Sequence, residues 1–141
     1  MTIAQNPEPD TRNQASPEKP SKASHSKAVV LVVDDDARIL RFIRASLKLA
    51  GYEVVTTQGG EEALAIVGSA ALDIVLLDIV MSPIDGLEVL KRLRQTSKLP
   101  VIIMSAHSSA SGEALRLGAD AFLAKPFTTD RLIAQIKELL G

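Results

Sequence analysis

The 141-residue sequence contains no cysteine and no tryptophan, and it has only three phenylalanines and one tyrosine. Without cysteine there is no disulfide scaffold, thiolate zinc site, iron–sulfur cluster or cysteine nucleophile. Because aromatic residues make up 3% of the chain, the core must be built from Val, Ile, Leu and Ala. The length supports one domain rather than two.

An excess of charge of either sign is also absent. The chain carries 16 basic and 17 acidic side chains, so its formal net charge is −1. This balance lacks the basic surplus that nucleic acid or an anionic membrane surface demands, so we expect neither as a direct partner. No apolar run is long enough to span a bilayer, and none resembles a secretory signal. These absences favour a cytoplasmic protein.

The first 27 residues differ in composition from the rest. After Ile3 they contain almost no large apolar side chain, and they are rich in Ser, Asn and Pro. Such a segment cannot bury enough apolar surface to offset the entropy lost on ordering. We therefore predict a disordered N-terminal tail over residues 1–27 and one folded domain over residues 28–141.

Residues 28–141 alternate between short apolar runs and amphipathic segments. The apolar runs predict strands at 29–33, 52–57, 73–77, 101–104 and 121–124. The amphipathic segments predict helices at 37–50, 61–67, 87–94, 112–117 and from about 129 to 140, the last one capped by Thr128 or Thr129. This order predicts an α/β fold, in which a doubly wound, five-stranded parallel sheet is covered by helices on both faces.

Polar residues follow the apolar runs, where sheets of this kind carry their chemistry. The residues at these positions are Asp34, Asp35, Asp36, Asp78, Ser105 and Lys125. Clustered carboxylates repel one another unless a positive charge offsets them, and carboxylate oxygens are ligands that Mg²⁺ prefers. The pattern therefore predicts a Mg²⁺ site that also contains a hydroxyl and an ammonium group.

Such a site suits the transfer of a phosphoryl group to a carboxylate. Asp78 would be the nucleophile, the metal would neutralise developing charge, and Lys125 and Ser105 would hold the phosphoryl oxygens. Taken singly, each residue has a simpler interpretation: a helix cap for Asp36, a turn for Ser105 and a solvated side chain for Lys125. Their joint position at one sheet edge favours the chemical interpretation.

Four segments, residues 29–36, 73–86, 100–105 and 118–127, resemble the response regulator receiver domain of two-component signalling. The resemblance extends over residues 29–140 and implies the flavodoxin-like (βα)5 fold. It implies that Asp78 is the phosphoacceptor, which takes a phosphoryl group from a sensor histidine kinase or a phosphotransfer protein. Asp34 and Asp35 resemble the acidic pair that binds Mg²⁺ together with Asp78, and the backbone carbonyl of Val80 resembles a further ligand.

The resemblance also implies a conformational switch. Ser105 matches the switch hydroxyl, Phe122 the switch aromatic residue and Lys125 the phosphoryl-binding lysine of the family, and the bond between Lys125 and Pro126 is expected to be cis. The protein would then be a phosphorylated signalling switch rather than a turnover enzyme. It would act on an unidentified downstream protein, as a monomer or a weak phosphorylation-dependent dimer.

Two departures from the family pattern affect these expectations. Pro83 lies one place later than usual after Asp78, which predicts an altered loop in which Gly86 still allows the turn. The interval from Ser105 to Lys125 is a couple of residues short, and residues 107–112 are small and polar. We therefore expect the fourth helix to be short, displaced or mobile, which puts in doubt an output face inferred by analogy.

Other functions compete with this interpretation. A phosphatase of the haloacid dehalogenase type would use Asp34 and Asp36, but it requires a further acidic pair where Lys125 stands, and it leaves Asp78 unexplained. A receiver that serves only as a docking module would not need the complete set of acidic, Ser and Lys residues. The sequence stops directly after the last predicted helix, so we expect a stand-alone receiver without a DNA-binding domain.

Overall fold

The computed structural model describes residues 27–141, so the predicted tail lies outside the described residues except for Lys27. Its five strands are β1 (Val29–Val33), β2 (Glu53–Thr57), β3 (Ile74–Asp78), β4 (Val101–Ser105) and β5 (Ala121–Ala124). They form one parallel sheet in the order β2-β1-β3-β4-β5. The chain reverses its winding direction at β1, so the crevice between the carboxyl ends of β1 and β3 is the expected place for a ligand.

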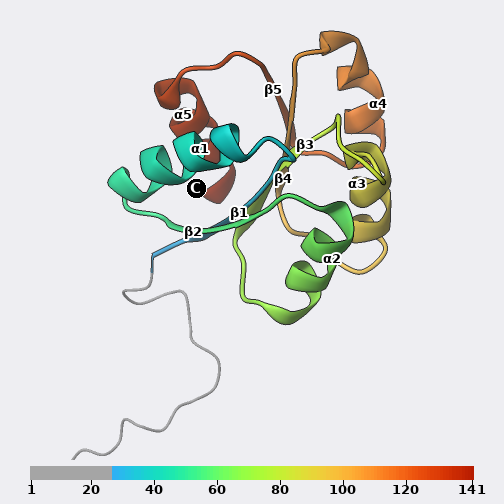
Figure 1. Ribbon diagram of the computed structural model, residues 1–141, viewed down its shortest axis with the longest axis horizontal. Coiled ribbons are helices and arrows are strands. Elements are labelled where there is room, and N and C mark those ends of the chain that lie inside the picture. Colours follow the sequence, from blue (N-terminus) through green and yellow to red (C-terminus); the bar gives the residue numbers. More distant parts are fainter. Residues whose placement is uncertain (1–26) are drawn as a thin grey trace, which may run out of the picture.

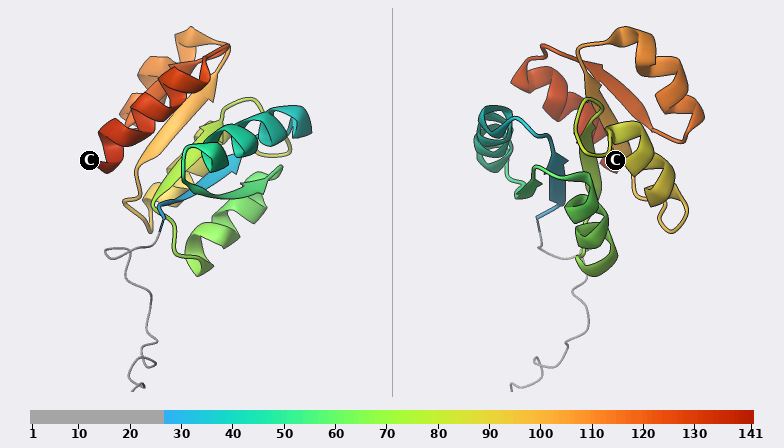
Figure 2. Two further views of the ribbon diagram at one scale, coloured as in Figure 1. Left: turned by 90° about the vertical axis from the view of Figure 1, so that its left-hand side faces the viewer. Right: turned by 45° about the vertical axis from the view of Figure 1, so that its right-hand side comes forward.

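Helices cover both faces of this sheet. The helices are α1 (Ala37–Leu49), α2 (Gly60–Ser69), α3 (Gly86–Arg94), α4 (Ser111–Arg116) and α5 (Thr129–Leu140). Figure 1 shows α1 and α5 on one side of the sheet and α2, α3 and α4 on the other, and Figure 2 shows the same layers from two further directions. The predicted doubly wound fold is confirmed. Among the described residues, no helix has the length and apolar character that crossing a membrane requires.

The core has two halves, one on each side of the sheet. Leu31 and Val33 of β1 pack in the half beneath α2, α3 and α4. Val30 and Val32 pack in the half beneath α1 and α5. Because successive strand residues point to opposite faces and both faces are buried, the strand reads as an unbroken apolar run. The core is aliphatic, as the composition predicts.

The side chains that directly precede three helices set where those helices begin. The Asp36 carboxylate accepts a hydrogen bond from the Arg38 N–H at 2.9 Å, and the Asp85 carboxylate accepts one from the Glu88 N–H at 2.9 Å. At the last helix, Thr128 rather than Thr129 is the cap. Each carboxylate or hydroxyl satisfies a backbone donor that has no partner within its helix.

Two predicted strand ends were wrong by one residue. Asp78 and Ser105 do not follow their strands but are the last residues of β3 and β4. Asp78 pairs in register with Met104, which extends the ladder through the acidic residue. Asp73, which we predicted to begin the third strand, lies before it, and its carboxylate accepts a hydrogen bond from the Val29 N–H at 2.7 Å.

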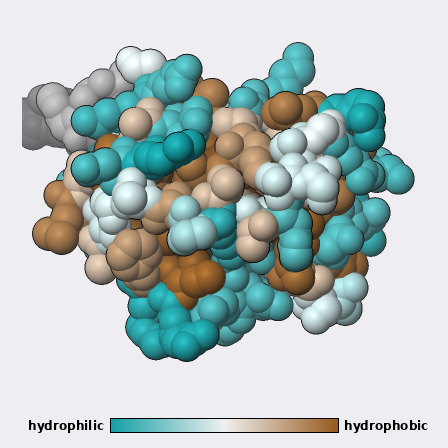
Figure 3. All heavy atoms as spheres, turned by 90° about the horizontal axis from the view of Figure 1, so that it is seen from above, coloured by the Kyte–Doolittle hydropathy of each residue, from teal (hydrophilic) through white to brown (hydrophobic). Residues whose placement is uncertain are grey.

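The fourth helix is short, as predicted. It has six residues, it follows a single 3₁₀ turn at Ser108–Ala110, and Ala114 is its one buried residue. The small and polar residues before it offer little apolar surface to pack on the sheet, so helical structure begins late. On the surface of the described residues, apolar side chains lie in separate patches among polar ones (Figure 3). The largest exposed ones are Phe42, Leu49, Val80 and Leu115.

Gly86 is required for a reason that differs from the predicted one. Its backbone has no positive φ, so it does not supply a turn that only glycine adopts. Instead α3 begins directly against the end of β3, where a Cβ on Gly86 would lie 2.1 Å from the backbone carbonyl oxygen of Asp78. The preceding loop has a cis bond between Ser82 and Pro83, which the sequence did not predict.

Replacing Gly86 by alanine tests this close approach. The added methyl group must push α3 away from the carbonyl of Asp78, so we expect Gly86→Ala to lower the free energy of unfolding by about 2 kcal/mol or more. Gly68→Ala in α2 is the matched control, because nothing lies within 4 Å of its Cβ position. Urea denaturation followed by circular dichroism measures both. Equal stability of Gly86→Ala and Gly68→Ala would contradict the steric argument.

Candidate functional site

The candidate site lies at the carboxyl ends of the strands, as predicted. Asp34 follows β1, Asp78 ends the neighbouring β3, Ser105 ends β4 and Lys125 follows β5. The parallel register places these ends at one edge of the sheet. Residues up to 91 positions apart in the sequence therefore lie in contact.

Three carboxylates form the centre of the site. One oxygen from each of Asp34, Asp35 and Asp78 lies within 4.8 Å of the others. Asp34 and Asp78 are 1% and 4% exposed, whereas Asp35 is exposed to solvent. Buried carboxylates at this separation repel one another strongly, since little water is present to screen them.

Lys125 supplies the positive charge within this cluster. Its Nζ donates hydrogen bonds to Asp78 Oδ1 at 2.9 Å and to Asp34 Oδ2 at 3.0 Å. Each contact is a charge-assisted hydrogen bond that is largely shielded from solvent. One ammonium group against three carboxylates leaves an excess of negative charge.

The pKa directions follow from this balance. Burial raises the pKa of Asp78, the hydrogen bond from Lys125 opposes that rise, and repulsion by Asp34 and Asp35 adds to it. Burial alone would lower the pKa of Lys125, but its hydrogen bonds to Asp78 and Asp34 outweigh burial, so that pKa is raised. The site therefore favours a charged lysine and disfavours the charge on Asp78.

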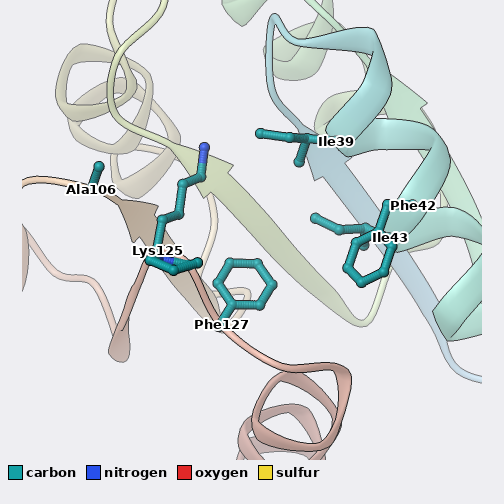
Figure 4. Close-up of a pocket in the computed structure, with 7 residues that line it drawn as sticks. Ile39, Phe42, Ile43, Ala106, Lys125 and Phe127 are labelled. Carbon is teal, nitrogen blue, oxygen red and sulfur yellow. The ribbon is translucent and has the colours of Figure 1, made fainter.

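The aliphatic part of Lys125 lies along an apolar groove. A cavity of about 320 Å³ is lined by Ile39, Phe42, Ile43, Ala106, Lys125, Pro126 and Phe127. Figure 4 shows the lysine chain extending between Ala106 and Ile39, with Phe127 and Phe42 on opposite walls. A lysine can bury its methylene chain in this way while its ammonium group reaches polar partners. The bond between Lys125 and Pro126 is cis.

Ser105 and Phe122 lie on the same face of the sheet. Ser105 is fully buried, and its Oγ accepts a hydrogen bond from the His107 N–H at 2.9 Å. β4 and β5 pair Ile103 with Phe122 and Ser105 with Ala124, so the serine and the phenylalanine belong to adjacent strands. Phe122 is partly buried and packs against the core half under α2, α3 and α4.

The structure adds polar contacts that the sequence did not predict, one of them from a residue, Gln58, that the sequence did not single out. The Asp36 N–H donates to Asp34 Oδ1 at 2.9 Å, which closes the acidic loop on itself. The Gln58 side-chain amide donates to the backbone carbonyl of Asp35 at 3.0 Å. Val80, whose carbonyl the resemblance implicates, lies two residues after Asp78 and is 57% exposed.

The candidate metal ligands suit a hard divalent cation. All the side-chain ligand atoms are carboxylate oxygens, and Lys125 compensates only part of their negative charge. A divalent ion would offset the remaining repulsion, and oxygen ligands with several waters are what Mg²⁺ prefers. The chain therefore has an acidic cluster of the type that binds Mg²⁺.

Comparisons with known proteins agree with this geometry. The family model of the response regulator receiver domain matches residues 30–137. The chain belongs to the response regulator receiver domain family. Response regulator MprA of Mycolicibacterium vanbaalenii is 42% identical over 114 residues, covering 79% of this chain and 49% of the relative. The probable transcriptional regulator ycf27 of Cyanophora paradoxa is 40% identical, covering 82% of this chain and 49% of the relative.

The chain therefore spans about half the length of these relatives. Among solved receivers, that of the Francisella response regulator 1452 is 36% identical with a TM-score of 0.77, covering 81% of this chain and 97% of that one. The response regulator TrrA of Thermotoga maritima, solved in complex with Mg²⁺ and BeF, is 36% identical with a TM-score of 0.75, covering 80% of this chain and 99% of that one. The chain is thus a receiver domain of the kind found in the response regulators of two-component signalling.

The raised pKa of Asp78 predicts a pH-dependent stability. The folded receiver binds a proton on Asp78 more readily than the unfolded chain does, so the ionised carboxylate destabilises the fold at neutral pH. This penalty is absent below the ordinary pKa of 3.8, where both states are protonated, and grows as the pH rises through the raised pKa. Without Mg²⁺, Asp78→Asn should therefore melt at a higher temperature than wild type at pH 7.

The advantage of Asp78→Asn should shrink as the pH falls toward 3.8, which thermal denaturation across a pH series measures. Asp85→Asn is the matched control, because its exposed carboxylate caps α3 and an asparagine can cap equally well. If Asp78→Asn is no more stable than wild type at pH 7, the ionised Asp78 carboxylate does not destabilise the fold.

Proposed function

We propose that this receiver domain accepts a phosphoryl group on Asp78 from a phosphohistidine and that the modified site changes partner binding. The observation that carries the proposal is the position of Lys125 Nζ, within 3.0 Å of both Asp34 and Asp78. A buried nucleophilic carboxylate beside an ammonium group and two further acids has the components that acyl phosphate formation needs.

The transfer is a displacement at phosphorus. A carboxylate oxygen of Asp78 forms the new P–O bond while the P–N bond to the donor imidazole breaks, and the electron pair of that bond stays on the imidazole nitrogen. Lys125 keeps its proton, since its pKa is raised, and it holds a phosphoryl oxygen by charge and hydrogen bonding. The reaction needs no oxidant and no other co-reactant.

Mg²⁺ would be held by Asp34, Asp35, Asp78 and the backbone carbonyl of Val80. When bound, it would neutralise part of the phosphoryl charge. The acidic cluster and the complex of TrrA with Mg²⁺ and BeF support this assignment. Repulsion within the cluster would otherwise oppose the arrival of an anionic group at Asp78.

Ser105 and Phe122 would convert phosphorylation into a change of surface. The Ser105 hydroxyl, which already accepts from His107, is free to turn its own proton toward a phosphoryl oxygen. Movement of Ser105 would open space on the face of the sheet where Phe122 packs, and the ring would turn inward. This is a shift between two packings of one core.

The proposal also covers the type of switch, its location, its oligomeric state and its output. We propose that the protein is a switch that phosphorylates and dephosphorylates itself rather than a turnover enzyme, that it works in the cytoplasm as a monomer or weak dimer, and that its output is a protein partner. The matched relatives include a probable transcriptional regulator, so an attached or separate nucleic-acid-binding function is the main alternative for the output.

Phosphorylation by acetyl phosphate tests the phosphoacceptor. Wild type should gain the mass of one phosphoryl group in the presence of Mg²⁺, and this gain should fall to background in Asp78→Asn, because an amide oxygen is a poor nucleophile. Asp85→Asn should be labelled like wild type. Intact-protein mass spectrometry measures all three. Steady turnover of a generic phosphate ester would instead favour a phosphatase, and full labelling of Asp78→Asn would remove Asp78 from its role.

A second variant tests the coupling between the serine and the phenylalanine. Ser105→Ala should still accept a phosphoryl group on Asp78 but should lose most of the phosphorylation-dependent change at Phe122, because the hydroxyl that follows the phosphoryl group is gone. Nuclear magnetic resonance of the Phe122 ring with and without acetyl phosphate measures this change. Ser109→Ala, at an exposed position of the next turn, is the control. A full response at Phe122 in Ser105→Ala would show that the switch uses another route.

A further inference from the structure

The turn between β2 and α2 contacts both loops that carry the acidic cluster, although it supplies none of the carboxylates. On the β1 side, the Asp34 N–H donates to the Thr57 carbonyl at 3.2 Å, and the Gln58 amide donates to the Asp35 carbonyl at 3.0 Å. Both bonds join residues 23 positions apart in sequence. The turn therefore holds the acidic loop from outside the carboxylate cluster.

On the β3 side, the same turn packs against the loop that follows Asp78. A Cβ on Gly60 would lie 2.7 Å from a side-chain carbon of Ile84 and 2.6 Å from one of Val89. Gly60 is buried, so α2 begins in close contact with the loop that contains Val80. The turn thus lies between the two chain segments that present oxygen atoms to the predicted metal.

The shape of the turn is itself fixed by side chains. The buried Thr57 hydroxyl donates to the Glu62 carboxylate and accepts a hydrogen bond from the Gly59 N–H at 3.3 Å. Gln58, between them, is directed out of the turn toward the acidic loop. Its long side chain therefore extends from an anchored backbone rather than from a free loop.

Asp35 is the member of the cluster that most needs this support. Asp34 and Asp78 are buried and both are bonded to Lys125. The Asp35 side chain is exposed, and within residues 27–141 no hydrogen bond to its carboxylate is found, while its backbone carbonyl is bonded to Gln58. Within residues 27–141, Asp35 is therefore held through its backbone, and Gln58 is the side chain that bonds to that backbone.

We infer that Gln58 is a positioning residue for divalent-cation binding: through the Asp35 carbonyl it orients the acidic loop so that Asp35 faces Asp34 and Asp78. This inference rests on the proposed function, since it concerns the same acidic site. Partners one shell away from a metal commonly tune its affinity by orienting the ligands. Gln58 acts here on the backbone of a ligand residue rather than on its side chain.

Magnesium titration of the full chain by calorimetry tests the inference. Gln58→Ala removes the amide, and Gln58→Met removes the donor while keeping a side chain of similar length. Both should bind Mg²⁺ about twofold to tenfold more weakly than wild type, which is the range expected for the loss of one hydrogen bond. Gln135→Ala on α5, whose amide lies 3.4 Å from Glu138, is the matched control and should bind like wild type.

Two further measurements separate positioning from a general loss of stability. Without metal, the Asp36 N–H, which bonds to Asp34 Oδ1, should exchange with solvent faster in both Gln58 variants, while their melting temperatures stay near that of wild type. At saturating Mg²⁺, acetyl phosphate should label them at the wild-type rate, because the variants change cation affinity and leave Asp78 and Lys125 intact.

The outcomes distinguish this inference from the function on which it rests. Unchanged Mg²⁺ affinity in Gln58→Ala and Gln58→Met, together with weakened binding in Asp35→Asn, would overturn the role of Gln58 and leave the acidic site in place. Wild-type binding by both Asp34→Asn and Asp35→Asn would overturn the proposed metal site itself. Equal losses of affinity in the Gln58 variants and Gln135→Ala would also overturn the positioning role.

Discussion

The structure depends on an unfavourable contact, the repulsion among Asp34, Asp35 and Asp78. Three carboxylates lie within 4.8 Å, two of them buried, and Lys125 offsets only part of their charge. Such an arrangement persists only if the rest of the fold holds it in place. This repulsion makes the site receptive to cations, and burial together with the repulsion raises the pKa of Asp78. The repulsion thus lowers the stability of the fold at the same sheet edge where it favours the binding of a cation.

The fold supplies that constraint through its buried strands. β1 and β3 are neighbours in the sheet and are covered on both faces, so neither can shift its register without exposing apolar side chains. Asp34 and Asp78 are carried to adjacent positions by this register. α3 begins against the backbone carbonyl of Asp78, so closely that Gly86 has no room for a side chain. This contact fixes the end of β3 from the side of α3.

Much of this could be predicted from the sequence, because buried parallel strands leave an unmistakable apolar pattern. The order of elements and the meeting of Asp78 with Lys125 follow from that pattern and from the geometry of parallel sheets. Strand ends were less certain, since Asp78 and Ser105 are polar yet continue the ladder. The contacts of Gln58 and Gly86 were not predictable, because each involves a backbone carbonyl that only the folded chain brings near.

The central claim is that Asp78, and no other member of the cluster, receives the phosphoryl group. Chemical trapping tests it most directly: after treatment with Mg²⁺ and acetyl phosphate, borohydride reduces an acyl phosphate to an alcohol, and peptide mass spectrometry locates the reduced residue. The account predicts a single reduced position, at Asp78. Reduction at Asp34 or Asp35, or a stable phosphoryl group on a serine or histidine, would contradict it.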